Sequence, residues 1–361
     1  MTLATLRIST LVLGALSSSA TAQWTVTNLN PAGSPFSYAY GGSGNQQVGN
    51  ALADGHNSAC LWSGTAASWV NLDPGSIISE AFGASGGQQV GYASFNDGYH
   101  ASLWSGTAAS WVDLNPKGST FSFAHAVSSG RQVGVAQLDD VYHAGIWSGS
   151  AASWTDLHPP GLEHSEAFGI DGGQQVGDTV VDGRLHAALW SGTADSWVDL
   201  HPAGANYSLA FGVQDGHQVG YALVDGQPRA SLWSGTAASW VNLDPAGSTH
   251  SEANDVSGTE QVGFAIIDGR LRAGLWSGTA DSWVDLSAFL PATFSSSAAE
   301  SIWSDENFTY IAGWGRDSVT ELEQALLWKR PIPSPGITVF LAAGALLAAR
   351  RRDKYSLSNT N

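Results

Sequence analysis

Short apolar runs follow one another along most of the chain, with polar turn residues between them. From Ser165 to Leu200, each run is four to eight residues long, rich in β-branched or aromatic residues, and bounded by Gly, Asp or Ser. Runs of this length and composition are typical of β-strands, whereas a helix needs a longer segment with apolar positions three or four residues apart. The pattern therefore predicts four strands in this segment.

The four-strand pattern is repeated with a fixed period. Its first marker is a tryptophan after Leu or Ile, which recurs every 42 to 43 residues: Trp62, Trp104, Trp147, Trp190, Trp233 and Trp276. A last, less regular copy is Trp328. Its second marker, a tryptophan after Ser, follows seven residues later in six copies: Trp69, Trp111, Trp154, Trp197, Trp240 and Trp283. A period of this length indicates a propeller, a solenoid or an array. Burial between repeats explains these tryptophans better than a ligand cage, because every repeat has them.

Connection lengths show which strands share a sheet. Most copies carry an Asp-Gly pair between the second and third strands: Asp54-Gly55, Asp97-Gly98, Asp182-Gly183, Asp225-Gly226 and Asp268-Gly269. Glycine accepts the positive φ that a two-residue hairpin requires. The fourth strand is followed by a longer loop containing Pro or Gly, which we expect to lead to the next sheet. Each copy is thus predicted to be one antiparallel meander.

Counting these meanders predicts a closed ring. Six complete sheets begin at Ser37, Ser79, Ser122, Ser165, Ser208 and Ser251. A seventh begins at Ser297 and lacks its outermost strand, while the strand-like segment at residues 24–29 has no sheet of its own. Pairing the two closes the ring, which predicts an all-β fold, a seven-bladed β-propeller of four-stranded antiparallel blades over residues 23–330. An open solenoid is the alternative, but it would need capping repeats.

The predicted propeller is strongly acidic, which limits its partners. The chain of 361 residues has a formal net charge of −17, and between Gln23 and Trp328 it has 30 acidic residues against 7 basic ones. Such a surface repels phosphate backbones and excludes nucleic-acid binding. Cys60 is the only cysteine, so no intrachain disulfide forms, and we interpret it as a small packed side chain. We predict no cofactor.

Both ends of the chain differ in composition from the repeats. Residues 1–22 contain one basic residue, an apolar stretch and small residues before Ala22, which predicts a signal peptide cut there by signal peptidase. Residues 331–361 contain Pro333, Ser334 and Pro335, then fourteen apolar residues, then an arginine cluster: Arg350, Arg351 and Arg352. Fourteen residues fall short of the roughly 20 that span a bilayer permanently, so we expect a transient membrane anchor.

The tail is similar to PEP-CTERM sorting signals, which combine a Pro-rich motif, an apolar helix and an arginine cluster. That signature normally reads Pro-Glu-Pro, where this chain has Pro-Ser-Pro. The resemblance implies processing by an exosortase-like enzyme and export to the cell surface or extracellular matrix of a Gram-negative-type bacterium. The repeats resemble the HAF family of extracellular repeats in the matching residues 186–190, 199–200 and 175–177. This second resemblance implies location and architecture and brings no activity.

Candidate chemistry is concentrated on the predicted innermost strands. Glu80, Glu166 and Glu252 share the second position of these strands and are expected at the mouth of the central channel. In one interpretation these carboxylates bind a cation or act as acid and base in catalysis. In the other they are solvated strand ends with only a structural role. We expect any ligand on the face that carries the long interblade loops and the Asp-Gly hairpins.

Two other patterns resemble catalytic or metal sites. In His164-Ser165-Glu166 and His250-Ser251-Glu252, alternation along a strand places the serine on the face opposite its neighbours, so we interpret it as a scaffold residue. His100, His143 and His186 share one repeat position in different blades, which favours exposed strand ends over a common metal. We assign no catalytic or metal-binding residue.

The sequence leads to two hypotheses about function. The first is an exported, non-catalytic surface or matrix propeller that acts as a binding or structural module, with exopolysaccharide or surface proteins as partners. The alternative is an extracellular hydrolase or lyase acting on a carbohydrate. For the second hypothesis, the only sizeable departure from the repeat is the acidic segment from Glu300 to Gln324.

Overall fold

The structure is a computed structural model that describes residues 23–333. The predicted signal peptide, with its cleavage site at Ala22, lies outside the described residues. So do the following parts of the predicted sorting signal: Ser334, Pro335, Arg350, Arg351 and Arg352. Pro333 is the last residue described.

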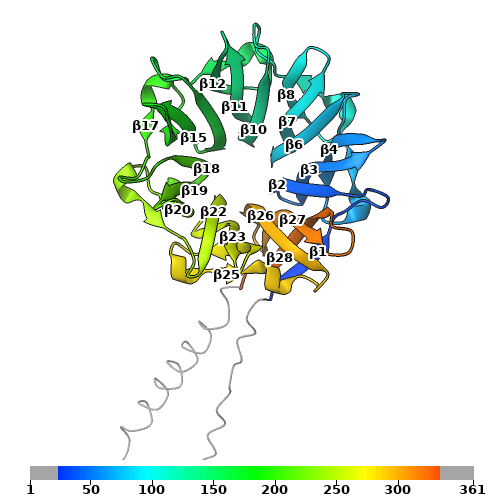
Figure 1. The fold of residues 1–361 in the computed structure, drawn as a ribbon. Helices are drawn as coiled ribbons and strands as arrows, with labels where there is room; N and C mark the ends of the chain where they lie inside the picture. Colours follow the sequence, from blue (N-terminus) through cyan, green and yellow to red (C-terminus); the bar gives the residue numbers. More distant parts are fainter. Residues whose placement is uncertain (1–22, 334–361) are drawn as a thin grey trace, which may run out of the picture.

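Seven four-stranded antiparallel sheets, the blades, surround a central axis (Figure 1). The innermost strands are β2 (Ser37–Ser43), β6 (Ile78–Ser85), β10 (Ser122–Ser128), β14 (Ser165–Asp171), β18 (Ser208–Gln214), β22 (Ser248–Ser257) and β26 (Phe294–Ser304). The second strands are β3 (Gln46–Ala53), β7 (Gln88–Phe95), β11 (Arg131–Leu138), β15 (Gln174–Val181), β19 (His217–Val224), β23 (Glu260–Ile267) and β27 (Phe308–Asp317). The predicted seven-bladed β-propeller is thereby confirmed.

The outermost strand is the shortest strand of each blade. The third strands are β4 (His56–Trp62), β8 (Gly98–Trp104), β12 (Val141–Trp147), β16 (Arg184–Trp190), β20 (Gln227–Trp233), β24 (Arg270–Trp276) and β28 (Glu323–Pro331). The outermost strands are β5 (Val70–Asn71), β9 (Val112–Asp113), β13 (Thr155–Asp156), β17 (Val198–Asp199), β21 (Val241–Asn242), β25 (Val284–Asp285) and β1 (Thr25–Asn28).

Short 3₁₀ turns are the only helices within residues 23–333. They are η1 (Ala66–Ser68), η2 (Ala108–Ser110), η3 (Ala151–Ser153), η4 (Ala194–Ser196), η5 (Ala237–Ser239), η6 (Ala280–Ser282) and η7 (Leu286–Phe289). The first six lie between the third and outermost strands, in the segment between the two tryptophans of each repeat. In this part of the chain, no helix is long and apolar enough to cross a bilayer.

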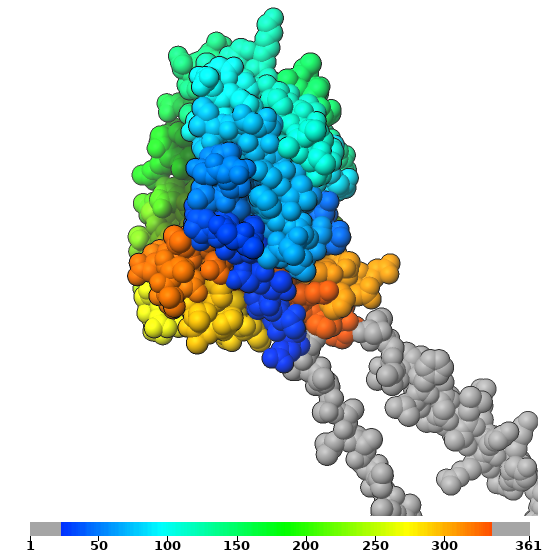
Figure 2. Space-filling view, turned by 90° about the vertical axis from the view of Figure 1, so that its right-hand side faces the viewer, coloured from blue at the N-terminus to red at the C-terminus, as the bar shows by residue number. Residues whose placement is uncertain are grey.

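The N-terminal strand closes the ring, as the sequence predicts. β1 pairs antiparallel with β28, and the register runs from Thr25 opposite Lys329 to Asn28 opposite Leu326. Figure 2 shows the first described residues, in blue, against the orange C-terminal strands. The seventh blade is therefore built from both ends of the propeller segment.

The repeated tryptophans form the core between neighbouring blades, where the first one of each repeat is fully buried. Trp147 of the third blade, for example, packs against Val90 and Leu103 of the second. The second tryptophan, such as Trp154, is only partly buried at the outer side of the same cluster. The expected burial thus holds completely for the first tryptophan and in part for the second.

A serine at the start of each innermost strand links the blade to the one before it. Its buried Oγ accepts a hydrogen bond from a backbone N–H on the third strand of the preceding blade, as Ser79 does from Ala59 at 2.9 Å. The other six serines are Ser37, Ser122, Ser165, Ser208, Ser251 and Ser297. Seven blades thus carry seven equivalent links.

The two faces of the ring differ in the connections they carry. Each innermost strand begins next to the end of the second strand, as the pairing of Ser37 with Ala51 shows. The long loop that leads into the innermost strand and the Asp-Gly hairpin that follows the second strand therefore lie on the same face of the ring. We call this end the loop face, and the opposite end, with the turns after the innermost strands, the turn face. Asp54 and Gly55 have φ of 51° and 86°, which is the hairpin geometry expected for Asp-Gly.

Candidate functional site in the central channel

Every innermost strand has a β-bulge at the same position, where its register with the second strand shifts by one residue, for example between Ala39 and Gly41. The innermost strands of the sixth and seventh blades have a second register shift nearer their start. The unpaired residues at the position common to all seven strands form what we call the bulge ring: Tyr40, Phe82, His125, Phe168, Phe211, Asn254 and Glu300. A bulge bends the strand and re-aims the extra side chain. All seven bulge residues line a central cavity of about 340 Å³.

Aromatic contacts run along five members of the bulge ring. Neighbouring ring centroids lie 5.7 Å apart for Tyr40 and Phe82, and 5.6 Å apart for Phe82 and His125. The series continues at 5.2 Å from His125 to Phe168 and at 5.6 Å from Phe168 to Phe211. These five blades form a continuous aromatic arc, which is interrupted at Asn254 and Glu300.

Polar side chains complete the bulge ring on the sixth and seventh blades. The Glu300 carboxylate accepts hydrogen bonds from Trp314 Nε1 at 2.8 Å and from Asn254 Nδ2 at 3.1 Å. Asn254 Nδ2 also donates to the backbone oxygen of Ala299 at 3.0 Å. Burial disfavours the ionised carboxylate and raises the pKa of Glu300 to about 7, although the bond from Trp314 acts in the opposite direction. Glu300 thus titrates near neutral pH.

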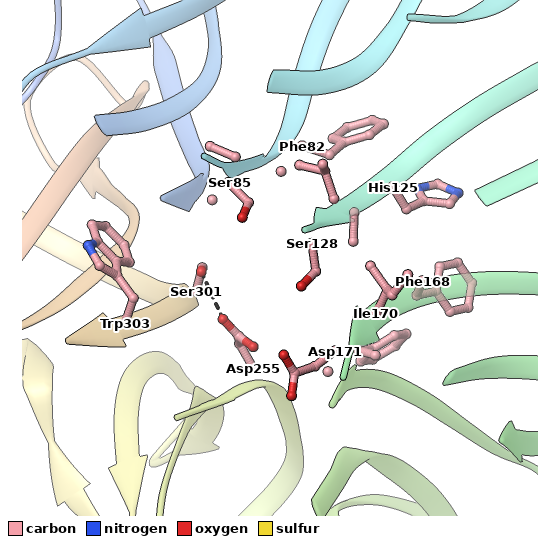
Figure 3. A pocket seen from close by; sticks show the side chains of 18 of the residues that line it. Phe82, Ser85, His125, Ser128, Phe168, Ile170, Asp171, Asp255, Ser301 and Trp303 are labelled. Atoms are coloured by element: carbon pink, nitrogen blue, oxygen red, sulfur yellow. Dashed lines mark hydrogen bonds between the residues drawn. The ribbon is translucent and has the colours of Figure 1, made fainter. Parts of the chain in front are cut away.

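The cavity extends from the bulge ring toward the turn face. Figure 3 shows Ser128, Asp171 and Asp255 around its open centre. Asp255 Oδ2 accepts hydrogen bonds from Ser301 Oγ at 2.8 Å and from the backbone N–H of Ile302 at 2.9 Å. Burial raises the pKa of Asp255 to about 6 in spite of these bonds. This cavity lies at the opposite end of the channel from the loop face, where we expected a ligand.

The three predicted glutamates lie on the loop-face side of the bulge ring and do not converge on one another. Glu80 accepts hydrogen bonds from Asn50 Nδ2 at 3.0 Å and Asn57 Nδ2 at 2.7 Å, both in the preceding blade. Burial raises the pKa of its carboxyl group, and the two amides offset this shift in part. Glu80 is therefore held between two blades.

The second glutamate belongs to a pair of carboxylates. Glu166 lies opposite Asp178 across β14 and β15, and its Oε1 is 2.7 Å from His125 Nε2. Asp178 is almost fully buried, and its Oδ1 is 3.1 Å from His164 Nε2. Burial raises the pKa of Asp178, and the charge of Glu166 adds to the rise. Burial alone would lower the pKa of His164, but its hydrogen bond and the charge of Asp178 raise it.

The third glutamate is bound by a histidine of its own strand. Glu252 Oε1 is 2.7 Å from His250 Nε2, and burial raises the pKa of Glu252. Ser251 lies on the other face, where its Oγ donates to Asp244 Oδ1 at 2.6 Å and accepts from the Ala230 N–H at 2.9 Å. The serine of each catalytic-looking motif thus belongs to the scaffold, as predicted from strand alternation.

The histidines at the common repeat position lie far from the channel, on the third strands. Each ring Nδ1 contacts the aspartate of the neighbouring outermost strand, at 3.0 Å for His100, 2.8 Å for His143 and 2.9 Å for His186. Different blades carry the three histidines, and each has a separate aspartate partner. Within the acidic segment, Asp305 is exposed and Asp317 is partly exposed, and both accept hydrogen bonds in local turns, whereas Glu300 lines the cavity.

Sequence reasoning missed most of the residues that surround the cavity. Asn254 and Glu300 occupy a bulge position that is aromatic in five blades, and Asp178 occupies a position where other blades have Asn, Tyr, Val, Phe or Trp. The sequence did contain a signal for these residues, since each is a polar residue at a repeat position where most other blades have an apolar or aromatic one. Strand alternation places the bulge position, the fourth from the serine of each innermost strand, on the same face as the predicted glutamates, but whether that face lines a cavity depends on how the seven blades are spaced around the axis.

Comparisons with known proteins identify the fold. No family model and no curated protein matches the chain, so the resemblances of its repeats and tail to known families stay predictions. A puromycin hydrolase complexed with PGG is 11% identical, with a TM-score of 0.56, over 80% of this chain and 53% of that one. The β-propeller domain of the Trilobed protease from Pyrococcus furiosus is 8% identical, with a TM-score of 0.54, over 83% and 97%.

A third solved structure belongs to the same group. An acylaminoacyl peptidase in complex with Z-Gly-Gly-Phe-chloromethyl ketone is 10% identical, with a TM-score of 0.51, over 84% of this chain and 54% of that one. The chain therefore spans about half the length of the puromycin hydrolase and acylaminoacyl peptidase chains. The Trilobed protease propeller is described as having an open velcro topology, whereas here β1 and β28 close the ring.

These neighbours correct the predicted function. The sequence led us to expect a non-catalytic surface or matrix module, with a carbohydrate hydrolase or lyase as the alternative. The solved propellers reported above belong instead to a hydrolase, a protease and a peptidase. The prediction of a surface or matrix module was wrong about the class of protein that shares this architecture. It rested on the uniformity of the repeats, which carries no information on what a propeller binds. At these identities the likeness itself shows the fold alone.

Proposed function

We propose that this chain is a substrate-binding propeller of a peptide-hydrolysing system, and that it holds a peptide or aminoacyl ligand in its central channel. The observation that carries the proposal is the cavity of about 340 Å³ to which every blade contributes its bulge residue. The propellers of a hydrolase, a protease and a peptidase, reported above, support the ligand class. Catalysis is assigned to a separate hydrolase unit, since the serines of the two His-Ser-Glu motifs are engaged in links between blades.

Binding and turnover of short peptides by the purified full chain test this proposal. Equilibrium dialysis against di- and tripeptides measures binding, and release of naphthylamine from aminoacyl naphthylamides measures hydrolysis. Ser128→Tyr places a large side chain in the cavity, and Ser148→Tyr in the same blade is the matched control on an exposed turn. We expect binding that is lost in the first variant and kept in the second, without turnover. Absence of binding, binding that survives Ser128→Tyr, or hydrolysis by the chain itself would overturn the proposal.

Export is a second part of the proposal. Residues 1–22 have the composition of a signal peptide, and residues 331–361 resemble a sorting signal. We assign the propeller to the outside of the cytoplasmic membrane, processed by signal peptidase and an exosortase-like enzyme. Mass spectrometry of the mature protein from the producing cell tests this, because the first residue is then Gln23. A mature protein that keeps residues 1–22 would contradict export.

A further inference from the structure

The bulge ring is asymmetric in its chemistry. The aromatic arc on five blades presents π faces and edges, while the remaining two blades present one amide and one carboxylate, Asn254 and Glu300. Aromatic faces attract cations and pack against apolar chains. A ligand that fits both parts carries a positive group beside Glu300 and an apolar portion along the arc.

Charges around the cavity favour the same ligand. Asp171, Asp255 and Glu300 line it, and within residues 23–333 no Lys or Arg does. The titratable and polar groups that face Glu300 from the elements packed against it are Tyr40, Glu252, Asn254 and Trp314. His250 binds Glu252, and Arg316, on the same strand as Trp314, binds Glu323. His125 is the single titratable base in the lining. A cavity with these walls concentrates cations, because low-dielectric surroundings strengthen the field of each carboxylate.

Glu300 has hydrogen-bonding capacity to spare. Each of its two oxygens accepts one hydrogen bond, from Trp314 and from Asn254, while an ionised carboxylate has about four acceptor positions. An ammonium group offers three N–H donors, so it satisfies free lone pairs that a neutral amide or a hydroxyl satisfies less well. The neighbouring aromatic ring of Tyr40 belongs to the arc and adds a face for cation contact.

We propose that the channel binds a protonated primary amine, with the ammonium group on Glu300 between Asn254 and Trp314 and the attached chain along the aromatic arc. This deepens the proposed function and rests on it, because it names the ligand end that is recognised. The α-ammonium group of a peptide and the ammonium group of a lysine side chain share this chemistry. Binding assays separate these two sources.

The test compares three peptides on the full chain by calorimetry: Phe-Gly-Gly-amide, acetyl-Phe-Gly-Gly-amide and acetyl-Gly-Lys-Gly-amide. If the α-amine is recognised, acetylation weakens binding by tenfold or more, about 1.4 kcal/mol, and the lysine peptide binds weakly. If the lysine side chain is recognised, the third peptide binds best. Acetylated Phe-Gly-Gly-amide that binds as tightly as both amines overturns the ammonium proposal while the peptide-binding function stands. Absence of binding by all three overturns both.

Variants and pH locate the site. Glu300→Gln should weaken binding of the preferred amine about tenfold, while Glu306→Gln, exposed in the same blade, leaves it unchanged. Affinity in the unmodified chain should rise from pH 5.5 to 7.5 as Glu300 ionises, and this rise should disappear in Glu300→Gln. Because the peptide series needs no variant, a poorly folded Glu300→Gln chain does not decide the outcome. An amine that binds equally to Glu300→Gln and to the unmodified chain places the ammonium group elsewhere and overturns the assignment.

Discussion

Ser37 Oγ accepts a hydrogen bond from the backbone N–H of Ala325 at 3.0 Å, and this bond joins the first blade to the last. The two residues lie 288 positions apart in the chain. The same Oγ donates to Asn30 Oδ1 at 2.7 Å, in the segment that follows β1. One serine therefore connects the ring closure by β1 with the repeated link between blades.

Ser37→Ala should destabilise the propeller. The substitution leaves the buried N–H of Ala325 without a partner, which costs about 1 to 3 kcal/mol. Ser122→Ala removes the equivalent link between the second and third blades and should lower the unfolding free energy by a similar amount. Denaturant unfolding followed by tryptophan fluorescence measures both. Ser63→Ala, on an exposed turn, is the control, and a Ser37→Ala curve that coincides with this control would show that the link contributes nothing.

The two tryptophans of a repeat should differ in their contributions. Trp147 is fully buried between the second and third blades, and Trp154, partly exposed, lies with its ring centroid 4.6 Å from that of Trp147. Trp147→Ala leaves a large cavity and should cost about 3 to 5 kcal/mol, while Trp154→Ala should cost clearly less because part of its surface already contacts water. Thermal unfolding of the two variants measures the difference. Equal losses would mean that the outer tryptophan is as important to the core as the inner one.

The fold was predictable because three independent signals agreed. The repeat period and the hairpin chemistry at positions such as Asp54-Gly55 predict a series of antiparallel sheets, and the unpaired strand at residues 24–29 predicts that seven of these sheets close into a ring. Each signal depends on local sequence or on the number of repeats, so each can be used without knowledge of tertiary contacts. The pairing of Thr25 with Lys329 is the consequence in space.

The site was predictable only in part, for a physical reason. Glu80, Glu166 and Glu252 were placed correctly on the innermost strands, because strand position follows from the pattern. Their partners were not predictable, since contacts such as Asn57 with Glu80 join different blades and depend on the twist and spacing of the sheets. Alternation puts Glu300 on the same strand face as the predicted glutamates, but its place in the cavity depends on the spacing of the seven blades, which no single strand pattern gives.

Cys60 should be unreactive in the folded protein. Its side chain is fully buried, and burial raises the pKa of its thiol well above the usual range, so the nucleophilic thiolate is scarce. Incubation with iodoacetamide followed by mass spectrometry should show no alkylation in native buffer and complete alkylation in denaturant. Ser63→Cys adds an exposed thiol as a positive control, which should react in native buffer. Alkylation of Cys60 at the control rate would contradict the packed position.

Stability should fall as pH rises from 5 to 7.5 because of the channel carboxylates. The folded pKa values of Asp255 and Glu300 are raised to about 6 and about 7, above the unfolded values of roughly 3.9 and 4.3. A carboxyl group with a raised folded pKa binds more protons when folded, so its stabilisation is complete below pH 4 and is lost as pH rises through the folded pKa.

Subtracting the unfolding curve of Glu300→Gln from that of the unmodified chain isolates the contribution of Glu300, since other titrating groups are common to both. The unmodified chain should lose more unfolding free energy between pH 5 and 7.5 than Glu300→Gln does, and the difference should accumulate from pH 5 to about 7 and level off above the folded pKa of Glu300. Glu306→Gln, exposed on the same blade, should follow the unmodified chain at every pH. Parallel curves for the unmodified chain and Glu300→Gln would mean that the carboxyl group of Glu300 ionises in the folded channel as it does in water.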